Sequence, residues 1–334
     1  MIIVCNPLRT ITPFHKITPL KLYYSYGNSP YQPYSSFAFD EIYISLQDLK
    51  DRGLISSIKF IEQCDKADYD VARKIKNDAI GEAFSNFSKD QNNLLKLVKF
   101  LKHNKRIKEY AEYITLRDLN QKKLWNLWEI TEISPENPTY LRHAFAQMIL
   151  FEEWKKIRKF ANKNGVEIIG DIPFYVGYDS SDVYFHKESF LLDRENKPTC
   201  IAGVPPDYFS KDGQRWGNPI WNWDYLYQND FKAMMDRLYF ASKFYDIVRI
   251  DHFRAFDSYW AINPACETAV DGEWRYPDGH FFFRRLFEKY PNINIIVEDL
   301  GDLRPQVLEL RDAFNLAGMR EIEFTIFEDE FENK

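Results

Sequence analysis

The segment Ile247-Val-Arg-Ile-Asp251 is a short run of β-branched residues that contains one arginine and ends in an aspartate. Two other apolar runs end in the same way, Val166-Glu-Ile-Ile-Gly-Asp171 and Ile293-Asn-Ile-Ile-Val-Glu298. Helical patterns at about residues 141–162 and 231–244 precede the first two strands in chain order. Near-continuous apolar strands that alternate with helices are typical of a parallel sheet covered on both faces, so the sequence predicts an α/β fold.

The first half of the chain has a different pattern. Residues 25–45 are rich in Tyr, Ser and Pro, which predicts a loop, with a short strand at 42–45. From about residue 60 to 135 the composition becomes polar and rich in lysine. Four apolar residues there have the i, i+3, i+4, i+7 spacing of one helix face: Leu94, Leu97, Val98 and Leu101. We therefore expect a helical insertion at about residues 60–135.

The composition excludes several classes of protein. The 334 residues contain 44 Lys and Arg against 50 Asp and Glu, a net charge of −6, which argues against nucleic acid or an anionic membrane as the main partner. No apolar run approaches the roughly 18 residues of a membrane span. The four cysteines form no CxxC pair, which fits a reducing compartment. We predict a cytoplasmic protein, and its 17% aromatic content suggests a sugar-binding surface.

An acid stands at the end of each of the three apolar runs, namely Asp171, Asp251 and Glu298. In an α/β barrel the carboxyl ends of the strands form the active-site rim, so we expect these acids to share one pocket. A single such acid is more often a helix cap or a solvated loop residue, but three in succession favour a site. Two kinds of chemistry remain open: a Mg²⁺ site, and glycosidic chemistry with one nucleophile and one proton donor.

The neighbours of these acids favour glycosidic chemistry. Asp251 lies among three cationic side chains, Arg249, His252 and Arg254, which are expected to keep it ionised as a nucleophile requires. Such cations would be out of place beside a metal ion. Glu298 follows Ile-Ile-Val, and an apolar wall raises the pKa of a carboxyl group towards the value that a general acid needs.

Residues 202–224 combine glycine and proline, which predict a loop, with several large aromatic side chains: Tyr208, Trp216, Trp221 and Trp223. Flat rings present an apolar face to the C–H side of a sugar, and three polar residues are placed to bind hydroxyls: Asp207, Gln214 and Asn218. Trp221 and Trp223 fit a core position equally well. Trp216 is the better ligand candidate.

Six stretches together resemble the 4-α-glucanotransferases of glycoside hydrolase family 77, the amylomaltases or disproportionating enzymes. They are Tyr26-Gly-Asn-Ser-Pro-Tyr-Gln32, Gly170-Asp-Ile-Pro-Phe-Tyr-Val176, residues 202–210, residues 213–219, Arg249-Ile-Asp-His-Phe-Arg254 and Glu298-Asp-Leu-Gly301. The resemblance covers residues 25–334 and implies a partial catalytic (β/α)8 barrel with the helical insertion. It also implies retaining transfer of α-1,4-glucan segments from a maltooligosaccharide, starch or glycogen to another glucan or glucose, with no cofactor and no metal.

The resemblance further implies a role for individual residues. Asp251 matches the nucleophile and Glu298 the general acid/base. Nine further residues fall on positions that contact substrate: Ser29, Tyr31, Asp171, Asp207, Gln214, Trp216, Asn218, Arg249 and His252. In that mechanism Glu298 protonates the leaving oxygen while Asp251 attacks the anomeric carbon, and Glu298 then activates the acceptor hydroxyl.

Two features depart from the family. Residues 1–24 form a divergent segment that does not match the family's first strand and helix. Family members carry a third carboxylate in a His-Asp-Asn motif, and no His-Asp pair occurs in this sequence. Loss of that group is expected to lower the rate by several powers of ten. We therefore expect a chain truncated at both ends with little activity, and two alternatives stay open: a non-catalytic glucan-binding module and a Mg²⁺-dependent barrel lyase.

Overall fold

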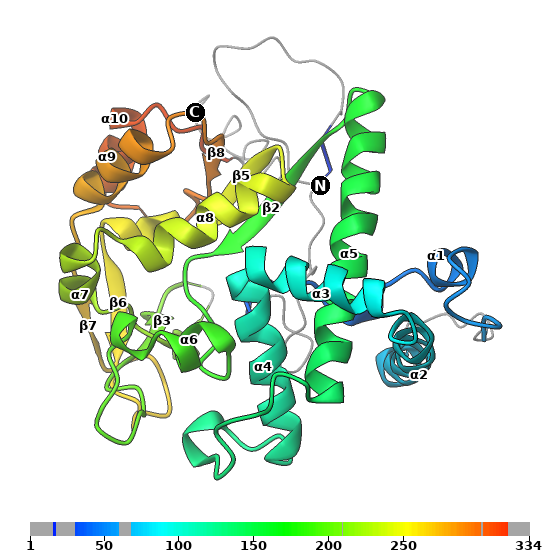
Figure 1. Cartoon of the computed structure of the whole chain (residues 1–334). Coiled ribbons are helices and arrows are strands. Elements are labelled where there is room, and N and C mark those ends of the chain that lie inside the picture. Colours follow the sequence, from blue (N-terminus) through cyan, green and yellow to red (C-terminus); the bar gives the residue numbers. More distant parts are fainter. Residues whose placement is uncertain (1–15, 18–30, 60–67, 209, 302, 320–334) are drawn as a thin grey trace. The chain divides into compact units, whose positions relative to one another are not determined.

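The computed structural model describes residues 16–17, 31–59, 68–208, 210–301 and 303–319 (Figure 1). They belong to two compact units. The sheet unit comprises Met1–Leu20, Ala161–Tyr178 and Lys187–Lys334, and the helical unit comprises Lys21–Phe160 and Asp179–His186. Among the helices in the described ranges, none is long and apolar enough to cross a membrane.

A four-stranded parallel sheet organises the sheet unit. Its strands, in spatial order, are β1 (Lys16–Ile17), β2 (Glu167–Pro173), β5 (Ile247–Asp251) and β8 (Ile295–Val297). Helix α8 (Lys232–Phe244) packs against β2 and β5, and Figure 1 shows it lying across these strands. The predicted alternation of apolar strands and helices is confirmed, and the α/β class with it.

The interior of this sheet is built by the β-branched residues of the three predicted runs. Ile169, Ile247 and Ile296 come from adjacent strands and form one buried cluster. Gly170 lies beside them, where a Cβ atom would stand only 2.0 Å from the ring of Tyr245. The glycine of the Gly-Asp pair is thus required by the close approach of a ring to the strand.

A second, antiparallel sheet occupies much of the stretch that was predicted to be a loop. It has the order β4 (Gln214–Pro219), β3 (Ile201–Val204), β6 (Tyr259–Ile262) and β7 (Gly272–Arg275). The prediction is wrong there because Gly203 marks a close approach between strands, with the carbonyl oxygen of Gln214 2.2 Å from the place of a Cβ atom. The strand register also shifts between Ile201 and Gly203, as in a β-bulge.

Many of the aromatic residues fill the interior of the sheet unit. Trp221 is 2% exposed, stacks on Phe190 and donates from Nε1 to the carbonyl oxygen of Phe174 at 3.1 Å. Trp223 is buried too, so both tryptophans are core residues. Rings also pack between α7 (Trp223–Gln228), η5 (Phe253–Phe256) and α9 (Gly279–Lys289). The unit further contains η4 (Lys187–Ser189) and α10 (Pro305–Ala313).

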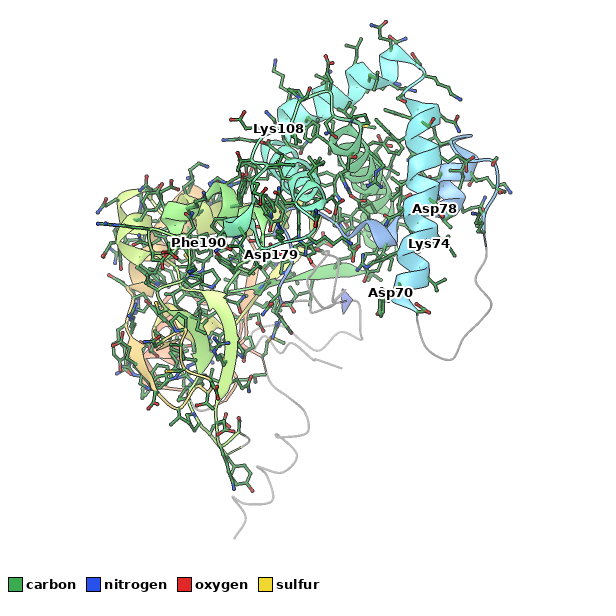
Figure 2. The ribbon with its side chains drawn as sticks, turned by 90° about the horizontal axis from the view of Figure 1, so that it is seen from below. Asp70, Lys74, Asp78, Lys108, Asp179 and Phe190 are labelled. Atoms are coloured by element: carbon green, nitrogen blue, oxygen red, sulfur yellow. The ribbon has the colours of Figure 1, made fainter. Side chains whose placement is uncertain are left out.

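The helical unit contains the helices that were expected between residues 60 and 135. Its elements are η2 (Glu41–Tyr43), α1 (Leu46–Asp51), α2 (Tyr69–Phe87), α3 (Gln91–His103), α4 (Lys105–Leu119), η3 (Trp125–Leu127), α5 (Pro138–Lys163, up to Phe160) and α6 (Ser181–Phe185). The helix predicted around Leu94–Leu101 is confirmed as α3; Leu97 and Leu101 are buried, whereas Val98 is 58% exposed. Asp70, Lys74 and Asp78 follow the exposed side of α2 at four-residue spacing (Figure 2).

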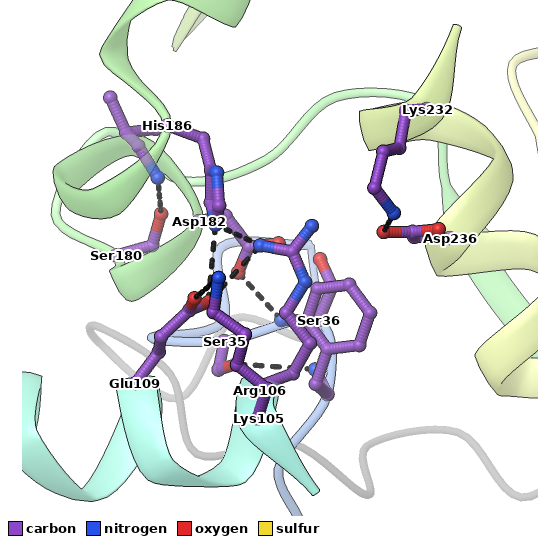
Figure 3. Close-up of polar contacts among 12 residues, drawn as sticks. Ser35, Ser36, Lys105, Arg106, Glu109, Ser180, Asp182, His186, Lys232 and Asp236 are labelled. Atoms are coloured by element: carbon purple, nitrogen blue, oxygen red, sulfur yellow. Dashed lines mark hydrogen bonds and ion pairs between the residues drawn. The ribbon is translucent and has the colours of Figure 1, made fainter.

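Residues 31–45 are largely irregular and are held by hydrogen bonds from their backbone N–H groups to side chains. The strand predicted at 42–45 is wrong, because Asp40 accepts a hydrogen bond from the N–H of Ile42 at 3.0 Å and starts a 3-10 helix. The N–H of Ser36 donates to Asp182 Oδ2 at 2.8 Å. Beside it, Glu109 Oε2 lies 3.1 Å from Arg106 Nη1 and also 3.1 Å from His186 Nε2, and so joins α4 to the end of α6 (Figure 3).

Glu153 on α5 is a buried acid of the helical unit. Both of its carboxyl oxygens lie 3.2 Å from the backbone nitrogen of Ser45, and burial raises its pKa to about 7. The folded state therefore holds this proton over a pH range in which the unfolded chain has already lost it. As a result, the free energy of unfolding contributed by Glu153 falls as pH rises from about 4.5 to 7.

We predict that Glu153→Gln raises the free energy of unfolding at pH 8 by on the order of 2 kcal/mol and changes it little at pH 4. Glutamine keeps an oxygen for the Ser45 N–H but carries no charge to bury. Urea unfolding at the two pH values measures the difference. Glu152→Gln, at an exposed position one residue earlier, is the control; a similar response of both variants to pH would contradict the prediction.

Candidate functional site

The parallel sheet brings together the three acids that end the predicted strands. Asp251 is the last residue of β5, and Glu298 directly follows β8. Asp171 lies within β2, which continues to Pro173, so the prediction that it ends the strand is wrong by two residues. The register of β2 and β5 sets Asp171 directly opposite Arg249.

Arg249 links two of these acids. Its Nη1 donates to Asp171 Oδ1 at 2.5 Å and to Asp251 Oδ1 at 2.9 Å. The side chains of Arg249 and Asp171 are 9% and 8% exposed, and that of Asp251 is 24% exposed. Burial raises the pKa of Asp171 more than Arg249 lowers it. Arg249 and Asp171 thus form a mostly desolvated ion pair. The nearby carboxylate of Asp251 is the third member of this charged cluster.

The charge environment of Asp251 differs from the expected one. Burial raises its pKa to about 6; Arg249 opposes this rise, and Asp171 and Glu298 add to it. The expectation of three neighbouring cations is wrong because His252 is neutral, its pKa being lowered to about 3 by burial and by Arg254. The guanidinium of Arg254 instead lies over the ring of Trp274, at 4.8 Å. Asp251 is nevertheless mostly ionised at pH 7, because that pH is above its pKa.

Glu298 is held by main-chain donors. Its Oε1 accepts from the N–H of Leu300, and its Oε2 accepts from the N–H of His252, both at 3.0 Å. His252 has a left-handed backbone, with φ of 57°. Burial raises the pKa of Glu298, while the two N–H groups and Arg249 lower it, and the net direction is upward. The predicted upward shift is confirmed in direction.

Rings from two other segments lie beside His252. The ring centroid of Trp216 lies 4.8 Å from that of His252 in an edge-to-face arrangement, and the ring centroid of Tyr175 lies 6.1 Å from it. Trp216 Nε1 donates to Gln214 Oε1 at 3.1 Å, which orients the indole. Tyr175 was missed by the sequence reasoning, although it lies in a quoted motif. The signal that could have found it is an aromatic residue within two positions of the end of an acid-bearing strand.

Two other predicted substrate contacts serve the scaffold as well. Asn218 is buried, and its Nδ2 donates to the carbonyl oxygen of Val176 at 2.8 Å, tying β4 to the chain after β2. Asp207 is exposed in the β3–β4 connection, where its Oδ1 accepts from the N–H of Ser210 at 2.7 Å. Their roles as substrate contacts stay predictions.

The two remaining predicted contacts come from the N-terminal part of the chain. Tyr31 is 42% exposed and belongs to the helical unit. Ser29 lies outside the described residues. The sheet unit therefore contains both catalytic candidates and seven of the nine predicted contact residues. These seven are Asp171, Asp207, Gln214, Trp216, Asn218, Arg249 and His252.

We predict that Arg249→Met lowers the free energy of unfolding at pH 8 by roughly 3 kcal/mol, because it leaves two buried carboxylates without their cation. The loss is smaller at pH 5, where those carboxyl groups take up protons. Urea unfolding at both pH values is the measurement. Arg285→Met is the control, since Arg285 also contacts two acids, Asp230 and Glu288, but at an exposed surface; an equal loss in both variants would contradict the prediction.

The chain is similar to several known proteins. The model of the 4-alpha-glucanotransferase family matches residues 5–334. A 4-alpha-glucanotransferase of Thermus thermophilus is 36% identical over 324 residues, covering 92% of this chain and 64% of that protein. The structure of the amylomaltase from Streptococcus agalactiae in complex with acarbose matches with a TM-score of 0.85 at 34% identity, covering 92% of this chain and 66% of that one.

A more distant structure supports the fold alone. The amylomaltase from Corynebacterium glutamicum matches with a TM-score of 0.72 at 17% identity, covering 91% of this chain and 45% of that one. The chain spans 64% to 66% of the length of the two more similar relatives.

Proposed function

The chain belongs to the 4-alpha-glucanotransferase family, glycoside hydrolase family 77, and from this premise we propose that its site carries out retaining transfer of α-1,4-glucan segments. The donor is a maltooligosaccharide or starch, and the acceptor is another glucan or glucose. The observation that carries the proposal is the contrast between two neighbouring acids. Asp251 is bound by a guanidinium, and Glu298 is bound by two backbone N–H groups.

We propose that the parallel strands belong to a (β/α)8 barrel. The order β1-β2-β5-β8, with helices between successive strands after β2, is the arrangement of consecutive barrel strands. The chain after α10 continues beside β8, where Ala317 pairs in parallel with Ile296. In a barrel the acids at the carboxyl ends of these strands face the substrate.

In the proposed first step, Asp251 attacks the anomeric carbon of the donor. Its Oδ1 is engaged by Arg249, which leaves Oδ2 as the attacking oxygen. The C–O bond to the leaving sugar breaks with its electron pair on the glycosidic oxygen, and Glu298 supplies the proton that this oxygen needs. The raised pKa of Glu298 keeps a larger protonated fraction at neutral pH than an ordinary glutamic acid has.

In the second step, Glu298 is the base. It takes the proton of an acceptor hydroxyl, whose oxygen displaces Asp251 from the anomeric carbon and restores the free carboxylate. The rings of Trp216 and Tyr175 form an apolar wall beside His252. We propose that Trp216, supported by the buried ring of Tyr175, binds the C–H face of a sugar, and that neutral His252 hydrogen-bonds a hydroxyl without adding a second cation.

The alternatives have less support. A divalent cation between the strand-end acids would compete with the guanidinium of Arg249, which already binds both Asp171 and Asp251. A non-catalytic glucan-binding module would use the aromatic wall but has no need of two carboxyl groups with different partners. Turnover and covalent labelling separate these possibilities.

We predict that Glu298→Gln, incubated with α-maltotriosyl fluoride, accumulates a glycosyl ester on Asp251. Fluoride leaves without an acid, whereas the second step lacks its base. Mass spectrometry of the peptide that contains Asp251 detects the adduct. Asp251→Asn is the matched control and is expected to form none. Glucan binding without an adduct in Glu298→Gln would favour the binding module, and activity that EDTA removes and Mg²⁺ restores would favour the lyase.

We also predict that kcat/KM for maltotriose disproportionation falls on the acid side with a midpoint near pH 6. Asp251 must be ionised to attack, and its pKa is raised to about 6. Below the midpoint the rate is expected to fall about tenfold per pH unit. An acid limb near pH 4 would contradict this assignment of the nucleophile's environment.

A further inference from the structure

We propose that Asp299, Arg311 and Met319 are positioning residues that fix the guanidinium of Arg249 and thereby hold Asp251 in its working orientation. The catalytic meaning of this arrangement rests on the proposed function. The arrangement itself involves only contacts within the sheet unit.

Asp299 directly follows Glu298, yet its side chain is only 4% exposed. Its Oδ2 accepts from Arg311 Nη1 on α10 at 2.7 Å, and its Oδ1 accepts from the N–H of Met319 at 2.7 Å. Both oxygens of this buried carboxylate are therefore engaged by neighbours. This occupation fits a positioning role.

The segment that Asp299 holds runs beside β8. The N–H of Val297 donates to the carbonyl oxygen of Ala317 at 2.9 Å, which begins the parallel pairing. At Gly318 a Cβ atom would stand 2.3 Å from Asp299 Oδ2. Only glycine permits the carboxylate to approach the chain this closely, so the glycine is part of the same arrangement.

Met319, whose backbone is held by Asp299, contacts Arg249 through its side chain. Its side chain is buried, and its Sδ accepts from Arg249 Nε at 3.1 Å. The same guanidinium uses Nη1 for Asp171 and Asp251. Because a guanidinium is planar, contacts at both Nε and Nη1 determine the direction of its plane. Displacement of Met319 would free one of these contacts and let the cation turn away from Asp251.

The test is an NMR titration of the Asp251 carboxyl group, in protein labelled with ¹³C at the aspartate carboxyl carbons. The Asp251 signal is identified by its loss in Asp251→Asn. The charged groups that face Asp251 are Arg249, Asp171 and Glu298, and none of them is substituted in the variants. In Asp299→Asn we expect the midpoint to rise by at least about half a pH unit, since a cation that is less well placed stabilises the carboxylate less.

Met319→Leu keeps the buried volume but removes the sulfur acceptor, so it reports on the same path if Asp299→Asn fails to fold. We expect a shift in the same direction. Asp312→Asn is the matched control, because Asp312 also contacts Arg311 but at an exposed position, and its midpoint is expected to equal that of the parent protein.

An unchanged Asp251 midpoint in folded Asp299→Asn or Met319→Leu would overturn the proposal, even if the variant melts at a lower temperature, because a purely structural role alters stability alone. The titration needs neither substrate nor turnover. Its outcome is therefore independent of the glycosyl-trapping experiment. Trapping of the glycosyl ester with unchanged Asp251 midpoints would support the proposed function and reject the positioning residues. Shifted midpoints without trapping would support the positioning residues and reject the proposed function.

Discussion

The guanidinium of Arg249 is a buried positive charge inside a parallel sheet, and the arrangement of the site depends on its neutralisation. An unpaired charge there would cost several kcal/mol, so carboxylates must lie beside it. Asp171 and Asp251 meet this need from adjacent strands and are 2.5 and 2.9 Å from Nη1. The contact with Asp171 requires the register of β2 and β5, because a shift of one residue would turn one of the two side chains to the other face.

The same burial gives neighbouring acids different properties. Burial raises the pKa of both Asp251 and Glu298. The rise at Asp251 is opposed by a cation, and the rise at Glu298 is opposed mainly by backbone N–H donors. Charge on Asp251 is stabilised directly by Arg249, whereas Glu298 keeps both oxygens oriented by N–H groups. Two carboxyl groups in such unlike settings are suited to two unlike tasks in one reaction.

Several elements were predictable because their signals are local. The apolar runs that became β2, β5 and β8 carry their own β-branched pattern, and the helix at 232–244 was placed within one residue. The β3–β4 hairpin was not predictable, since Gly203 and the neighbouring prolines are equally typical of a loop. Strand β3 also pairs with β6, which lies more than fifty residues after it in the chain. The short strand expected at 42–45 failed because a single capping aspartate outweighed β propensity.

The sequence by itself determined the α/β class, the positions of the acids at or near strand ends and the resemblance to glucanotransferases, because these follow from periodicity and short motifs. The tertiary structure decided which cations reach Asp251, that His252 is neutral beside Trp216 and Tyr175, and that Trp221 and Trp223 belong to the core. It also decided that Asp299, adjacent to Glu298 in sequence, faces Arg311 and Met319 instead. The physical reason is that charge state and side-chain partners depend on burial and on distances between segments far apart in the chain.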